Sequence, residues 1–253
     1  MSVNIFRPFK KLIREAKSRR QASRRDIRKL IPEISESEIS VLREFSPFTM
    51  TSTERQWALV QAVKYVDAEK IPGDFVECGV WRGGNVMIAK TLSQGSPVAR
   101  KFYLFDTFAG MSAPTDADKS HTGHDASLTF KERVKADHVD WVYASLEDVR
   151  ANFQKAGLID DSVVFVKGKV EDTLKESGNL PDKISILRLD TDFYESTRAE
   201  LEILYPRLQS GGILIVDDYG HWRGARQAVD EYFKGSNLLM FRVDYTARMM
   251  IKK

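Results

Sequence analysis

Short apolar runs alternate with helical periodicity along most of this chain. Five runs predict buried strands, at residues 75–78, 102–105, 163–166, 184–189 and 213–216. Helical patterns lie between them, for example at 85–92 and 225–233. Because strands alternating with helices form a parallel sheet with helices on both faces, we predict a doubly wound, Rossmann-like α/β fold. Two further runs, at about 238–244 and 247–252, predict C-terminal strands that make the sheet mixed, with an antiparallel last strand.

Three regions differ in pattern. Residues 1–33 form a basic amphipathic arm, residues 34–70 a helical segment, and residues 71–253 the α/β domain. Within the helical segment, Thr51-Ser-Thr-Glu54 has the spacing of a capping box that opens a helix. A long polar excursion at about 112–144 interrupts the α/β domain. An excursion of this length is usually functional in a compact domain, so we predict a lid over the substrate.

Charge separates the arm from the rest of the chain. Residues 1–30 contain eleven Lys or Arg and two acids, a charge of +9, so the net charge of +3 leaves −6 for the remainder. The arm suits an anionic membrane surface, an acidic partner, or the body of its own or a neighbouring subunit. The body has no basic stripe with stacking aromatics, so we expect no nucleic-acid partner.

Composition narrows the class of protein further. The 253 residues are 42% hydrophobic and 30% charged, as in an ordinary globular protein. The single cysteine, Cys78, excludes a disulfide scaffold and a cysteine-rich zinc site. With no apolar stretch long enough to cross a bilayer, we expect a cytoplasmic location, with peripheral attachment to a membrane through the arm as an alternative.

Acidic residues follow four of the predicted strands. They are Glu77, Asp106, Asp190, Asp217 and Asp218. Ligands of a doubly wound sheet bind outside the carboxyl ends of its strands, so these acids are expected to meet in one site.

The first strand leads into Glu77-Cys-Gly-Val-Trp-Arg-Gly-Gly84, a glycine-rich turn that starts with an acid. The glycines let the backbone approach a ligand closely. An acid at this point would repel the pyrophosphate of a dinucleotide, which disfavours hydride transfer to a nicotinamide. Asp106 can accept both hydroxyls of a ribose. A nucleoside with a cationic group fits both acids, which points to S-adenosylmethionine.

Several long motifs resemble the TylF/MycF macrocin O-methyltransferase family. They are Phe48-Thr-Met-Thr-Ser-Thr-Glu-Arg55, the glycine-rich turn, Leu104-Phe-Asp-Thr-Phe-Ala-Gly-Met111, Leu187-Arg-Leu-Asp-Thr-Asp-Phe-Tyr-Glu-Ser-Thr197 and Gly211-Gly-Ile-Leu-Ile-Val-Asp-Asp-Tyr219. The resemblance runs from about residue 48 to the C-terminus. It implies a class I methyltransferase fold, a homo-oligomer, and Mg²⁺-dependent methylation of a sugar hydroxyl of a glycoside, glycan or nucleotide-sugar.

The resemblance also implies roles for individual residues. Asp190, Asp217 and Asp218 would bind Mg²⁺. The cofactor would contact Thr49, Met50, Glu77, Cys78, Gly79, Val80, Trp81, Asp106, Thr107 and Phe108. Gly168 and Lys169 follow the third strand, where the adenine passes in this fold, although a plain turn explains them equally well. Ser145 is either a further adenine contact or simply a helix N-cap.

The chemistry of a sugar hydroxyl agrees with a metal. An alcohol proton is held with a pKa near ~16, about as tightly as that of water, and a bound cation stabilises the developing alkoxide. Three carboxylates suit the hard Mg²⁺ ion. Asp190 is the expected base and His221 its rival.

Two other hypotheses use the same fold. A phenol or catechol acceptor needs less activation, and such sites often pair the metal with a lysine base. A cofactor-binding interaction module, tethered by its arm and without turnover, would have no need for three metal carboxylates.

Overall fold

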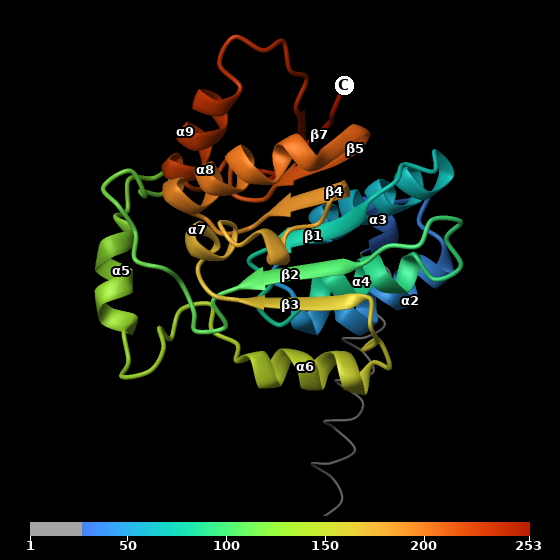
Figure 1. Cartoon of the computed structure of the whole chain (residues 1–253), viewed down its shortest axis with the longest axis horizontal. Helices are drawn as coiled ribbons and strands as arrows, with labels where there is room; N and C mark the ends of the chain where they lie inside the picture. Colours follow the sequence, from blue (N-terminus) through green and yellow to red (C-terminus); the bar gives the residue numbers. More distant parts are fainter. Residues whose placement is uncertain (1–26) are drawn as a thin grey trace, which may run out of the picture. The chain divides into compact units, whose positions relative to one another are not determined.

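A mixed seven-stranded sheet is the centre of residues 44–253 in the computed structural model, which describes residues 27–253 (Figure 1). Its strands are β1 (Asp74–Cys78), β2 (Phe102–Asp106), β3 (Val163–Lys167), β4 (Ile184–Leu189), β5 (Leu208–Val216), β6 (Phe241–Arg242) and β7 (Arg248–Ile251). They are ordered β3-β2-β1-β4-β5-β7-β6. The first five are parallel, β7 runs antiparallel to β5, and β6 antiparallel to β7. The predicted fold class is confirmed.

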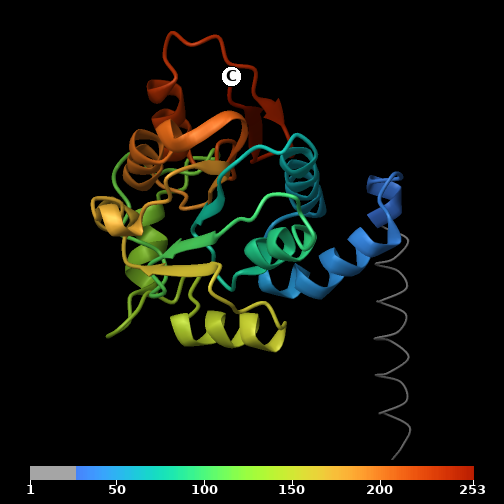
Figure 2. The same ribbon diagram turned by 45° about the vertical axis from the view of Figure 1, so that its right-hand side comes forward.

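Helices cover both faces of the sheet (Figure 2). One face carries α3 (Thr53–Ala68) and α4 (Gly84–Leu92), and the other carries α7 (Val170–Thr173), α8 (Tyr194–Ile203) and α9 (Arg223–Tyr232). The helix α6 (Leu146–Lys155) lies beside the edge strand β3. Each apolar sheet face is thereby removed from water, which is the main stabilising term for such a fold.

The alternation of side chains along β1 and β4 sets up the site. Val76 and Cys78 of β1 join Leu187 and Leu189 of β4 in the apolar core under α8 and α9. The residues between them point to the opposite face. Glu77 is there the register partner of Arg188, so an acid and a guanidinium meet inside the sheet.

The start of α3 differs from the predicted capping box. Ser52, not Thr51, is the N-cap, and its hydroxyl accepts the backbone N–H of Arg55 at 3.2 Å. The Thr51 hydroxyl instead lies 2.9 Å from that of Thr49 and 3.2 Å from the side-chain oxygen of Asn85. Both Thr51 and Ser52 are good caps, and the tertiary contact with Asn85 decides between them.

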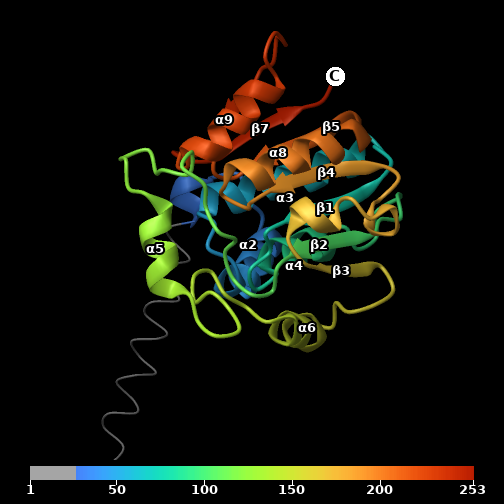
Figure 3. The same ribbon diagram turned by 60° about the vertical axis from the view of Figure 1, so that its left-hand side comes forward.

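The excursion between β2 and α6 contains α5 (Ala126–Arg133), which lies beyond the carboxyl ends of the parallel strands (Figures 1 and 3). Fully buried Asp118 attaches the excursion to the start of α8, because its carboxylate accepts the backbone N–H groups of Tyr194 at 2.8 Å and Thr115 at 2.7 Å. Trp141 of the excursion packs on Phe193 and Trp222. The predicted lid therefore has an anchored base against α8.

Residues 1–26, most of the predicted basic arm, lie outside the described residues. Residues 27–43 belong to a separate unit, which includes most of α2 (Glu36–Phe45). The other unit begins at Glu44 and thus includes α3, within the segment predicted as 34–70. The division at 33 and 70 stays a prediction.

Candidate active site

A cavity of about 380 Å³ lies at the carboxyl ends of the parallel strands. Twelve of the residues named from the sequence line it: Thr49, Met50, Gly79, Val80, Trp81, Asp106, Thr107, Gly168, Asp190, Asp217, Asp218 and His221. These residues come from segments spread over more than 170 positions, and the parallel sheet brings their strand ends to one edge.

Five of the named residues do not line this cavity. Glu77 and Cys78 are buried within β1, and burial raises the pKa of the Cys78 thiol. Phe108 packs on Phe165, with ring centroids 6.4 Å apart. The Ser145 hydroxyl caps α6 by accepting the backbone N–H of Asp148 at 3.1 Å, and Lys169 is exposed at the start of α7. Ser145 and Phe108 thus have structural roles, and their predicted contacts with the cofactor stay predictions.

The glycine-rich turn is held in place by Asp106. One carboxylate oxygen accepts the backbone N–H groups of Val80 at 2.8 Å and Trp81 at 3.1 Å, and the other accepts that of Phe108 at 2.8 Å. Gly79 has φ +80°, and a Cβ there would lie 2.0 Å from the carbonyl oxygen of Asp190. Only glycine fits this close approach between β1 and β4. This wall of the cavity is consequently shaped by backbone.

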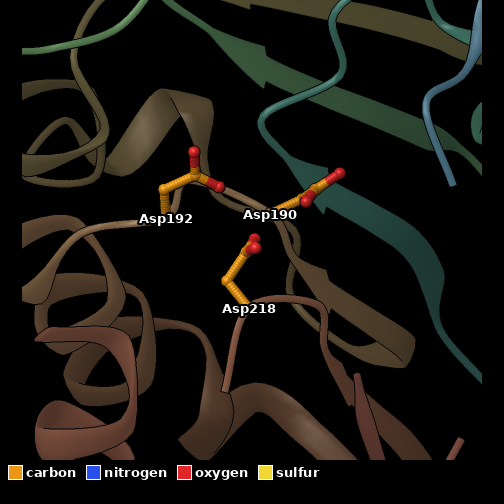
Figure 4. A group of neighbouring side chains, drawn as sticks. All are labelled: Asp190, Asp192 and Asp218. Carbon is orange, nitrogen blue, oxygen red and sulfur yellow. The ribbon is translucent and has the colours of Figure 1, made fainter. Parts of the chain in front are cut away.

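Aspartates from β4 and β5 form the opposite wall. Carboxylate oxygens of Asp190, Asp192 and Asp218 lie within 4.8 Å of one another, and the three side chains are neighbours (Figure 4). Burial, followed by the charges of neighbouring acids, raises the pKa values of Asp190 and Asp218 well above their usual range. For Asp192 burial is again the first cause, and its pKa is raised to about 7.

Asp192 was not among the residues predicted from the sequence. It has φ +71°, in the left-handed region that a non-glycine residue adopts at a cost of about 1–3 kcal/mol. This backbone turns its carboxylate back toward Asp190 and Asp218. The signal in the sequence was a second acid two positions after the strand-end Asp190.

Two arginines hold the fourth acid of this wall, Asp217. Arg188 pairs with one carboxylate oxygen and Arg55 with the other. Arg188 also donates to Glu77 and Asp190, in each case at 2.6 Å. A charged residue inside the apolar run 184–189 was the sequence signal for Arg188. Arg55 is the last residue of the motif that begins at Phe48, and no site role was predicted for it.

Glu77 does not line the cavity, but it is hydrogen-bonded to Asn85, which does. Its Oε1 accepts from Arg188 and, at 3.1 Å, from the amide of Asn85, which lines the cavity. Its Oε2 is buried without a hydrogen-bond partner in the described part of the chain. An unpaired buried acceptor is costly, so this corner of the site is suited to a donor or a cation.

The sequence model of the Macrocin-O-methyltransferase (TylF) family matches residues 12–252. The chain belongs to this family. A relative from Streptomyces olivaceus, 8-demethyl-8-(2,3-dimethoxy-alpha-L-rhamnosyl)-tetracenomycin-C 4'-O-methyltransferase, is 38% identical over 185 residues, which cover 73% of this chain and 67% of the relative. Mycinamicin III 3''-O-methyltransferase of Micromonospora griseorubida is 35% identical over 73% of this chain and 69% of its own length.

Solved structures agree with this assignment. The O-methyltransferase NovP superposes with a TM-score of 0.71 at 30% identity, covering 81% of this chain and 82% of NovP. The calicheamicin methyltransferase CalS11, at 19% identity and a TM-score of 0.60, shares the fold. The protein is therefore an S-adenosylmethionine-dependent O-methyltransferase. Between residues 27 and 253, none of its helices is long and apolar enough to cross a membrane.

Aromatic side chains line a third side of the cavity of this macrocin-family methyltransferase. Trp141 and Trp222 meet edge to face with centroids 6.2 Å apart. The His221 ring lies 5.0 Å from Trp222, and its Nδ1 lies 3.3 Å from the Tyr245 hydroxyl. Burial, helped by the nearby His121 and Arg55, lowers the pKa of His221. His221 is consequently neutral near pH 7 and able to accept a proton.

Proposed function

We propose that this protein methylates a sugar hydroxyl and uses a divalent cation, Mg²⁺ being the best match. The main support for the proposal is the negative charge of the acidic wall, which is the side of the cavity formed by the aspartates after β4 and β5. Asp190, Asp192, Asp217 and Asp218 line the cavity, whereas Arg55 is the one guanidinium or ammonium group among its described lining residues. Such an excess of carboxylates is stable only with cations nearby.

The residues present fit a hard cation. Asp190 and Asp218 belong both to the set predicted from the sequence and to the observed cluster, and the cluster offers oxygen atoms alone. Oxygen ligands are those that Mg²⁺ prefers. We assign Asp217 as the third ligand, because it follows the same strand as Asp218 and lines the same wall. When bound, the cation lowers the pKa of a hydroxyl placed against it.

The cofactor fits the opposite wall. Gly79, Val80 and Trp81 line this wall together with the Asp106 carboxylate, whose negative charge suits the hydroxyls of a ribose. Asn85, backed by Glu77, faces the same region. When bound, S-adenosylmethionine supplies a methyl group on a sulfonium. The hydroxyl oxygen of the acceptor forms the bond to the methyl carbon while the sulfur keeps the electron pair of the broken carbon–sulfur bond.

The proton of that hydroxyl needs an acceptor on the protein. The sequence favoured Asp190 over His221, but Asp190 already accepts from Arg188 at 2.6 Å. We propose Asp192, because its carboxylate lies beside those of Asp190 and Asp218 and contacts Trp222, and no arginine is bonded to it in the described part of the chain. A general base has to lie within hydrogen-bond reach of the proton that it accepts.

The acceptor is proposed to be the sugar of a glycoside. The tetracenomycin relative carries a methylated rhamnosyl group in its name. Trp141 and Trp222 provide apolar faces on which a sugar ring can pack. The phenol hypothesis expected a lysine base, and no lysine is found among the described residues that line the cavity. Docking of the arm to an anionic partner or membrane, and a homo-oligomeric state, stay predictions.

Methyl transfer to a panel of glycosides, nucleotide-sugars and phenols, followed by mass spectrometry, tests the proposal. We expect methylated sugars, loss of turnover in EDTA and recovery with Mg²⁺. Asp218→Asn should reduce turnover on the order of 100-fold or more, because the cation supplies several kcal/mol. Asp161→Asn, an exposed acid before β3 at the opposite edge of the sheet, is the matched control. Full activity in EDTA would remove the metal from the proposal, and exclusive methylation of phenols would remove the sugar.

A further inference from the structure

Arg55 joins three segments of the chain at the cavity. It lies in the first turn of α3, and its guanidinium pairs with Asp217 at the end of β5. Its Nε lies 3.1 Å from a carboxylate oxygen of Asp244, in the turn between β6 and β7. Its Nη2 donates to the backbone carbonyl of Met50 at 3.4 Å. Because Met50, which the resemblance predicts to contact the cofactor, also lines the cavity, Arg55 connects this residue to the acidic wall.

Each oxygen of Asp217 lies against a guanidinium while both arginines hold it, so a cation placed there would be repelled by two positive charges. Its side chain is 3% exposed, and each oxygen accepts from a different guanidinium. One arginine has to yield before a cation can bind there. Arg188 is 3% exposed and has Glu77 and Asp190 as further partners, so it is locked in place.

Arg55 is the arginine that can move. Its side chain is 16% exposed, and Asp244 remains as a partner if Asp217 is lost. Asp244 is itself fixed, since it accepts from the Ser52 hydroxyl at 2.8 Å and from the backbone N–H of Ala247 at 2.8 Å. The ion pair with Asp244 therefore offers Arg55 a second position at no cost of an unpaired buried charge.

We propose that Arg55 is a positioning residue that competes with the divalent cation for Asp217. Without the cation, Arg55 neutralises Asp217. With the cation, Arg55 is displaced toward Asp244 and its bond to the Met50 carbonyl changes. Cation binding is thereby linked to the backbone at Thr49 and Met50, and the linkage is reciprocal. This inference rests on the proposed function, because it takes Asp217 as a metal ligand.

The competition can be tested by titrating the full chain with Mn²⁺ and measuring the free Mn²⁺ by its paramagnetic resonance. This measurement of affinity does not depend on catalytic activity. We expect Arg55→Gln to tighten Mn²⁺ binding by roughly 5- to 50-fold, within the usual range of coupling between sites. Arg198→Gln, which removes an exposed guanidinium from α8, should leave the affinity unchanged. Asp244→Asn should weaken binding, because Arg55 then keeps Asp217 as its one carboxylate partner.

A double-mutant cycle separates this mechanism from a general effect of charge. If Asp244 acts through Arg55, Asp244→Asn should have little effect in the Arg55→Gln background. Equal effects of Asp244→Asn in both backgrounds, or an unchanged or weaker affinity in Arg55→Gln, would overturn the inference. Absence of Mn²⁺ binding to the unsubstituted protein would instead overturn the proposed metal site.

Hydrogen exchange of the unsubstituted protein supplies a test that needs no variant. We expect Mg²⁺ to speed amide exchange in the peptide that contains residues 49–55, since the contact between Arg55 and the Met50 carbonyl is released. Unchanged exchange at saturating Mg²⁺ would contradict the link, even if Arg55→Gln proves unable to fold.

Discussion

The two walls of the cavity hold their carboxylates in opposite ways. On the β1–β2 side, Asp106 accepts three backbone N–H groups and is the single acid of that wall. On the β4–β5 side, Asp190, Asp192 and Asp218 crowd within 4.8 Å and Asp217 depends on two arginines. The first wall is complete as it stands. The second has more negative charge than the described side chains around it neutralise.

This difference indicates how the two walls work. A wall whose acid is saturated by backbone is pre-organised, so it can bind its ligand without rearrangement. Crowded acids in the other wall lower the stability of the folded protein without a cation. A cation that binds there restores this stability. Substitutions of Arg188, Asp106 and Asp192 should each affect one wall more than the other.

Arg188→Met should destabilise the acidic wall the most. It leaves Glu77, Asp190 and Asp217 without their shared partner, and breaking a buried ion pair costs about 3–5 kcal/mol. Urea denaturation should show this loss, whereas Arg198→Met on the exposed face of α8 should change the free energy of unfolding by less than about 1 kcal/mol. Equal stabilities of the two variants would mean that the acids do not depend on Arg188.

Asp106→Asn should damage the other wall. It weakens the bonds to the Val80 and Trp81 amides and removes the charge offered to the ribose, so we expect the affinity for S-adenosylhomocysteine to fall about tenfold. Calorimetric titration measures this affinity. Asp218→Asn should leave it within about threefold, since Asp218 belongs to the acidic wall. The reverse order would show that the cofactor lies against the acids of β4 and β5.

Asp192→Asn should stabilise the metal-free protein in a pH-dependent way. The pKa of Asp192 is raised to about 7 by burial and by neighbouring acids, so the ionised form costs stability as the pH rises from about 4 to 7. In EDTA, the variant should match the unsubstituted protein near pH 4 and exceed it by roughly 2 kcal/mol above pH 7. Thermal unfolding across this range measures the difference. A constant difference at all pH values would exclude the ionisation of Asp192 as its cause.

Ser145→Ala should have the smallest effect. Loss of the cap on α6 is worth about 1 kcal/mol, and the affinity for S-adenosylhomocysteine should not change, because Ser145 does not line the cavity. Ser177→Ala, at an exposed serine of the 3-10 helix η2 (Ser177–Asn179), controls for loss of a hydroxyl. Weakened cofactor binding in Ser145→Ala would support the predicted adenine contact after all.

The sequence predicted most of the fold and, among the residues of the site, the acids that follow strands. The apolar runs predicted where the strands lie along the chain. The acids that directly follow strands were also predicted, because a residue at the end of a parallel strand lies at the edge of the sheet where ligands bind. Residues that enter the site from elsewhere were missed. Arg55 lies on α3 and Asn85 on α4, and both helices bring their side chains to the cavity from outside the strand ends.

Asp192 shows why spacing alone was insufficient. Two positions beyond the strand end, an extended or helical backbone would aim its carboxylate differently, and the left-handed turn at φ +71° brings it back to Asp190 and Asp218. No local preference of an aspartate in this stretch dictates that conformation. The surrounding structure has to stabilise it.

The sequence by itself determined the α/β class, the edge of the sheet that carries the site, and the acids collected there, because all three depend on local periodicity and on the position of a residue along its strand. The tertiary structure decided how those acids are neutralised. The register between β1 and β4 sets Arg188 beside Glu77, and the packing of α3 brings Arg55 to Asp217 from 162 positions away. Such pairs depend on distances between segments remote in sequence, which only the folded chain fixes.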